Sequence, residues 1–93
     1  MSLYDNEHPW VRNLRNKRNE TVEYWYDNSK KVTNLVDEII SESGASRWIN
    51  AQKRFQLLHE KIFNAKSEHD LDSLQKEMKE CINILKEELK KYK

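Results

Sequence analysis

The sequence predicts an all-α protein, an antiparallel three-helix bundle with a long first helix. The 93 residues include one glycine, Gly44, and one proline, Pro9, so the chain lacks the turn residues that a sheet requires. Apolar residues recur at steps of three, four and seven over long stretches, as they do on one face of a helix. The breaks after residue 43 and near residue 66 are short, so successive helices are expected to pack antiparallel within one domain, 1–93.

The first helix is predicted over about residues 9–43. Pro9 is tolerated in a first turn, Asp5 or Asn6 is expected to cap it, and Gly44 is a natural left-handed stop. A helix of this length would measure roughly 50 Å at 1.5 Å per residue. Three poor helix formers in a row around Asn28 leave a second arrangement open, because a break there would give a four-helix bundle.

The second helix is predicted over about residues 46–65 and the third over about 68–92. Ser46 and Ser67 are the expected N-caps, and Asp70 completes a capping box with Ser67. The third helix has a heptad-like apolar seam: Leu71, Leu74, Met78, Cys81, Leu85, Leu89 and Tyr92. This seam is typical of a bundle or of a dimeric coiled coil, and the intramolecular bundle is the more economical interpretation.

The predicted helix lengths do not match. Helices of about 20 and 25 residues cannot cover a first helix of about 35 residues. Because most apolar residues of the first helix lie in its 22–40 part, the uncovered stretch is expected at residues 10–21.

Apolar and aromatic side chains of the first helix are the predicted protein interface: Trp10, Val11, Leu14, Tyr24, Trp25 and Tyr26. Exposed aromatic clusters commonly mark binding sites. Trp25 lies on the apolar stripe of its helix and is expected in the core, whereas Tyr24 and Tyr26 cannot both share that face. The alternative is that Leu3 and Tyr4 fold back and cover the cluster.

A basic segment in the first helix defines a second hypothesis, nucleic-acid binding, through Arg12, Arg15, Asn16, Lys17, Arg18 and Asn19. Arginine and asparagine can pair with base edges, and basic side chains meet phosphates. The net charge of only +1, and the acids Glu20, Glu23 and Asp27 that follow, argue against this function. Nucleic acid is therefore the less favoured partner.

Residues for catalysis, metal binding or cofactor binding are not recognisable. His59-Glu60 begins like a zinc-protease helix, but Phe63 stands where the second histidine is needed. Cys81 lies on an apolar seam, where burial raises the pKa of a thiol and makes it a poor nucleophile. One glycine is too few for a phosphate-binding loop. We expect neither an enzyme nor a small-molecule substrate.

The single cysteine cannot form an internal disulfide, and the sequence has no apolar stretch of membrane-spanning length. These features predict a cytoplasmic or otherwise intracellular protein without a membrane partner. The expected function is a non-enzymatic helical interaction module, a small regulatory or adaptor protein that binds another protein or a second copy of itself as a homodimer.

Overall fold

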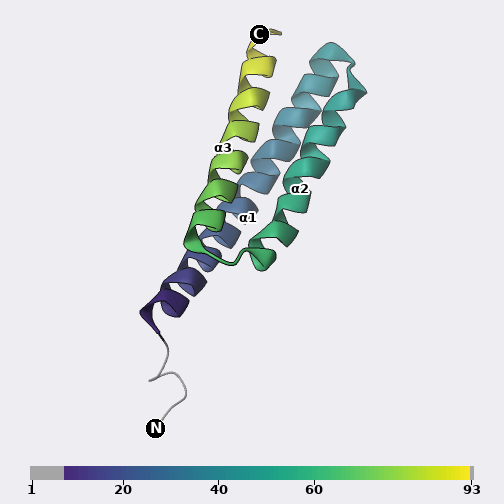
Figure 1. Ribbon diagram of the computed structural model, residues 1–93. Coiled ribbons are helices and arrows are strands. Elements are labelled where there is room, and N and C mark those ends of the chain that lie inside the picture. Colours follow the sequence, from purple (N-terminus) through teal and green to yellow (C-terminus); the bar gives the residue numbers. More distant parts are fainter. Residues whose placement is uncertain (1–7, 93) are drawn as a thin grey trace.

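A computed structural model gives the structure of residues 8–92 (Figure 1). The elements are helix α1 (Pro9–Ser43), a short 3₁₀ helix η2 (Ser46–Trp48), α2 (Ile49–Asn64) and α3 (Glu68–Lys90). Helix α2 returns beside α1, and α3 then runs in the direction of α1 (Figure 1). Residues 8–92 contain no strand. The prediction of an all-α, three-helix bundle with a long first helix is confirmed.

Helix α1 passes through Asn28 without a break. The Asn28 side-chain amide donates to the Tyr24 carbonyl oxygen at 2.8 Å, and the Ser29 hydroxyl donates to the Trp25 carbonyl oxygen at 2.8 Å. These side chains bond to carbonyls one turn back, so they do not draw the backbone into another conformation. The four-helix alternative is therefore wrong.

The two ends of α1 differ in how they are capped. Gly44 adopts a left-handed conformation with φ 71°, and its N–H donates to the Ile40 carbonyl oxygen at 2.7 Å, which confirms the predicted stop. At the other end His8 occupies the N-cap position without a side-chain cap bond. The predicted caps Asp5 and Asn6 lie outside the described residues.

The start of α3 follows the sequence prediction more closely than the start of α2. The Ser67 hydroxyl accepts from the Asp70 N–H at 3.1 Å, while the Asp70 carboxylate accepts from the Lys66 N–H at 3.2 Å. The prediction that Ser46 caps α2 is wrong. Ser46 begins η2, which continues into α2, and Trp48 at the N-cap position is already helical. A side-chain cap needs an extended residue there.

The core draws on all three helices. Its buried apolar residues are Val32, Val36, Ile39, Phe55, Leu58, Ile62, Ala65, Leu71, Leu74, Met78, Ile82, Leu85 and Leu89. The predicted seam of α3 is confirmed except at two positions: Cys81 is half-buried and Tyr92 is exposed, whereas Ile82 is buried. A straight helix turns 3.6 residues per turn, so position 82 returns to the face of Met78 and Leu85.

Candidate interaction surface

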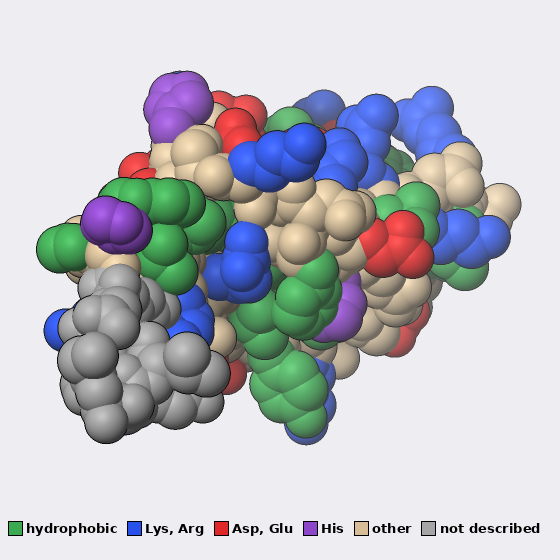
Figure 2. Space-filling model, turned by 60° about the horizontal axis from the view of Figure 1, so that its bottom comes forward, with side chains coloured by type: hydrophobic (Ala, Val, Ile, Leu, Met, Phe, Trp, Pro, Cys, Tyr) green, Lys and Arg blue, Asp and Glu red, His purple; other side chains and the backbone are tan. Residues whose placement is uncertain are grey.

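The first turns of α1 project past the ends of the other two helices (Figure 1). Trp10 is 61% exposed, Val11 is half-buried, and the half-buried Leu14 packs against the edge of the core. Figure 2 shows this end of the molecule, where hydrophobic side chains reach the surface. We call Trp10, Val11 and Leu14 the projecting patch.

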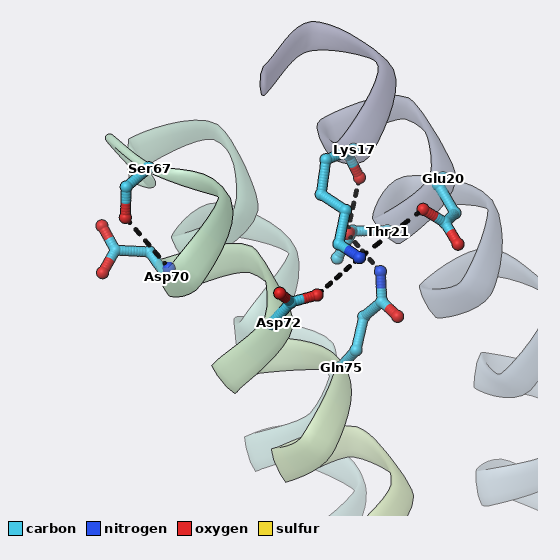
Figure 3. Close-up of polar contacts among 7 residues, drawn as sticks. All are labelled: Lys17, Glu20, Thr21, Ser67, Asp70, Asp72 and Gln75. Carbon is cyan, nitrogen blue, oxygen red and sulfur yellow. Dashed lines mark hydrogen bonds and ion pairs between the residues drawn. The ribbon is translucent and has the colours of Figure 1, made fainter. Parts of the chain in front are cut away.

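Helix α3 contacts α1 closer to the N-terminus of α1 than the sequence predicts. The Lys17 ammonium forms an ion pair with Asp72 of α3 and lies 3.9 Å from the Glu20 carboxylate (Figure 3). Thr21 is fully buried: its hydroxyl donates to the Lys17 carbonyl oxygen at 2.7 Å and accepts from the Gln75 amide at 2.8 Å. The expectation that residues 10–21 are uncovered is therefore wrong for their second half, because the first turn of α3 reaches down to Lys17.

The contact with Asp72 also changes the acidity of Lys17. The hydrogen bond from the ammonium to the Asp72 carboxylate favours the charged form and raises the pKa of Lys17 above its ordinary value, against a smaller opposing effect of desolvation. Arg18 is also engaged, since its guanidinium donates to the Ala65 carbonyl oxygen at 2.8 Å. Lys17 therefore links α1 to α3, and Arg18 links α1 to the α2–α3 connection.

Trp25 belongs to the junction between α1 and α2. Its indole N–H donates to the Phe55 carbonyl oxygen at 2.9 Å. Its ring centroid lies 4.5 Å from that of His59, which in turn meets Phe63 edge to face at 4.9 Å. Trp25 is half-buried and packs against the core, so this member of the predicted interface is largely used within the bundle.

The remaining aromatic candidates do not share one surface. Tyr24 is half-buried against the core, whereas Tyr26 is 74% exposed, which confirms that at least one of the two is exposed. Trp10 and Tyr26 are 16 residues apart on one helix, which places them about 160° apart around its axis at 100° per residue. The six predicted interface residues therefore divide between the projecting patch, the edge of the core at Tyr24, the α1–α2 junction at Trp25 and the exposed Tyr26.

The predicted nucleic-acid face is likewise divided. Arg12, Arg15, Asn16 and Asn19 are exposed on α1, whereas Lys17 and Arg18 make the contacts with α3 and the α2–α3 connection described above. The two cations that would have flanked this face are turned toward the bundle.

A groove between α2 and α3 was not anticipated from the sequence. Its central part has a volume of about 370 Å³, and Trp48, Ala51, Arg54, Glu77, Glu80, Cys81, Ile84 and Leu85 line it. Ile84 is 59% exposed there. Burial raises the pKa of the half-buried Cys81 thiol, as expected for a cysteine on an apolar seam, while the nearby Arg54 opposes the shift.

Residues 8–92 offer no group of three histidine, cysteine, aspartate or glutamate side chains placed to hold a metal ion. Over the same range, no helix combines the length and the apolar character that crossing a membrane requires. The fold and its surfaces define a small all-helical bundle whose described surface includes the projecting patch on α1 and the groove between α2 and α3. Comparison with protein-family models, with curated proteins and with solved structures finds no match to this chain.

Proposed function

We propose that the protein is a non-enzymatic helical interaction module that binds another protein through the projecting patch. The observation that carries this proposal is the 61% exposure of Trp10 on a helical segment that α2 and α3 do not reach. Tryptophan at the centre of an apolar cluster is a frequent hot spot of protein interfaces. A small regulatory or adaptor role in the cytoplasm, where the single Cys81 remains a thiol, fits this chemistry.

The surroundings of the patch indicate the chemistry of the partner. Leu14 is held against the core, so it gives the patch a fixed base, while Trp10 extends from it. The exposed Arg12 and Arg15 lie about 160° and 140° from Trp10 around the axis of α1 at 100° per residue, so they face away from it. An apolar pocket would complement a tryptophan that extends from an aliphatic base.

Site-specific photo-crosslinking tests this proposal. A photoreactive phenylalanine at position 10 is compared with the same residue at position 57, because Leu57 is 59% exposed on α2. We expect one defined protein adduct from position 10 that position 57 does not give. With the purified partner, Trp10→Ala should weaken binding at least about tenfold, as truncation of a hot spot does.

The control for this experiment is Leu57→Ala, which removes an equally exposed apolar side chain from another helix. Equal adducts from both positions, or unchanged affinity of Trp10→Ala, would show that the projecting patch is not the binding site. Circular dichroism of each variant establishes that the fold is retained.

Nucleic-acid binding is the second candidate, and the shared exposure of Arg12, Arg15, Asn16 and Asn19 favours it. Binding to a labelled single-stranded oligonucleotide would then weaken steeply with salt and be lost in Arg12→Glu/Arg15→Glu. The proposal of a protein partner predicts instead that affinity for the partner depends little on salt. A fluorescence-anisotropy titration at two salt concentrations separates these outcomes.

A further inference from the structure

Among residues 8–92, the hydrogen bonds and ion pairs between helices lie on two of the three sides of the bundle. The inter-helix hydrogen bonds and ion pairs are Trp25 with Phe55, Thr33 with Gln52, Lys17 with Asp72 and Thr21 with Gln75. Each of them joins α1 to α2 or α1 to α3. In the part of the chain that the structure describes, none joins α2 to α3. The α2–α3 side is thus the open side of the bundle.

An apolar groove follows this open side. Its central part is floored by Ala51, Cys81 and Leu85 and bordered by Trp48 and Ile84. A second, more polar hollow between the same two helices shares Glu77 with the groove and is lined by Lys61, Asn64, Ala65, Asp70, Ser73, Leu74 and Glu77. A furrow between two helices, lined by small and aliphatic side chains, is where further helices pack in a four-helix bundle.

The two rims of the groove carry opposite charges. On the side of η2 and α2 the residues are basic and recur every seven positions: Arg47 in η2, and Arg54 and Lys61 in α2. On the α3 side they are acidic: Asp70, Glu77 and Glu80. Within residues 8–92 no ion pair joins one rim to the other. Charges that flank an apolar seam in this way select the partner and its orientation in coiled coils.

A second copy of the chain would match this charge pattern in one orientation. A two-fold axis parallel to the helices places α2 of each copy opposite α3 of the other, so that basic rims face acidic rims. Rotation about this axis leaves each residue at the same height along the helices, so equivalent heights of the two grooves face each other. Arg54 and Glu80 line the same part of it, so Arg54 of one copy meets Glu80 of the second. A perpendicular axis would bring two basic rims together, and their repulsion disfavours it.

We infer that the α2–α3 groove is a self-association site that takes the same groove of a second copy, forming a two-fold dimer with α2 and α3 of both chains around a shared apolar seam. The inference concerns a different face from the projecting patch and does not rest on the function proposed for that patch. The resulting interface would cover the exposed Ile84 and leave the N-terminal turns of α1 outside it.

Charge reversal tests this inference, with sedimentation equilibrium as the measurement. The wild-type protein should be a dimer that dissociates on dilution. Arg54→Glu and Glu80→Arg should each weaken the dimer at least about tenfold, because the two-fold axis repeats every changed contact. The double variant Arg54→Glu/Glu80→Arg should dimerise again, since its rims are attractive once more.

Lys53→Glu is the matched control, because Lys53 is exposed on α2 and does not line the groove. It changes the net charge as Arg54→Glu does and should leave the dimer unchanged. Circular dichroism shows whether each variant keeps its helices, and Lys61→Glu repeats the test at a second level. A wild-type monomer at every concentration, a dimer insensitive to single reversals, or a double variant that fails to dimerise would each overturn the inference.

The single thiol supplies an independent readout. Cys81 lines the groove, so in the dimer it should be shielded from a thiol reagent such as dithiobisnitrobenzoate. The rate constant for modification of the wild-type protein should therefore fall several-fold as the concentration rises through the dimer dissociation constant. A rate constant independent of concentration, in a sample that sedimentation shows to be dimeric, would place the interface elsewhere.

Discussion

Two parts of one helix, its first turns and its C-terminal part, have different environments. The C-terminal part of α1 carries Val36 and Ile39 with no exposed surface, whereas Trp10 in its first turn is 61% exposed. Both parts space their apolar residues as a buried helix face does. The difference therefore arises from how far α2 and α3 extend along α1. Burial of a helix depends on its neighbours as much as on its own pattern.

The boundary between the two parts is a set of polar contacts. Lys17 and Thr21 contact Asp72 and Gln75 of α3 at the level where α3 begins to cover α1 (Figure 3). The Arg18 guanidinium donates to the Ala65 carbonyl oxygen. A substitution in α1 should therefore lower the free energy of unfolding less the closer it lies to the first turn of the helix.

The largest loss of stability is expected in the C-terminal part of α1, which packs against α2 and α3. Ile39→Ala should lower the free energy of unfolding by about 2–5 kcal/mol, because it removes a fully buried side chain and leaves a cavity. Trp10→Ala should change it by less than about 0.5 kcal/mol, since Trp10 is largely in water. Urea titration followed by circular dichroism measures both. A large loss of stability in Trp10→Ala would contradict the view that the first turns of α1 lie outside the core.

The next effect is expected at the boundary. Thr21→Val should lower the free energy of unfolding by about 1–3 kcal/mol, because the Gln75 amide loses its buried acceptor while the shape is kept. Thr21→Ser retains the hydroxyl and serves as the control, with a smaller loss expected. If valine and serine variants were equally stable in urea, the hydrogen bond would have no role in fixing the boundary.

A smaller effect is expected from the base of the projecting patch. Leu14 is half-buried at the edge of the core, so Leu14→Ala should lower the free energy of unfolding by about 1 kcal/mol, a fraction of a full leucine burial. Thermal unfolding of this variant and of Ile39→Ala shows how the loss of stability changes with position along α1. A loss as large as that of Ile39→Ala would mean that the core extends through the first turns.

Much of the fold could be predicted because it depends on local signals. Gly44 and Ser67 are a stop and a cap whose chemistry acts within a few residues, and both are confirmed. Ser46 was wrongly assigned because the choice between an extended cap and a 3₁₀ turn depends on how the chain enters α2. The continuity of α1 at Asn28 depended on which acceptor its side chain would find, and propensity alone does not determine this.

The surfaces were harder to predict than the helices. The projecting patch followed from the mismatch of helix lengths, but its extent did not, because the offset between α1 and α3 is a tertiary property. The groove was missed because Cys81 was placed on the buried seam. A signal was present: basic residues recur at 47, 54 and 61, and acidic residues at 70 and 77. Heptad recurrence of charge on both helices is typical of rims that flank an interface.

The smallest effect is expected from the ion pair between Lys17 and Asp72, because Asp72 is largely exposed and water screens the attraction. The pair raises the pKa of Lys17, so its contribution is fully present below the ordinary lysine pKa and is lost as pH rises through the raised value. The melting temperature of Asp72→Asn should therefore lie slightly below that of the wild type at neutral pH, and the gap should close in strongly alkaline solution. Thermal unfolding of both proteins across this range measures the gap, and their comparison cancels the titration of other lysines. A gap that persists unchanged when Lys17 is neutral would show that Asp72 acts through packing, and the boundary would then rest on Thr21 and Arg18.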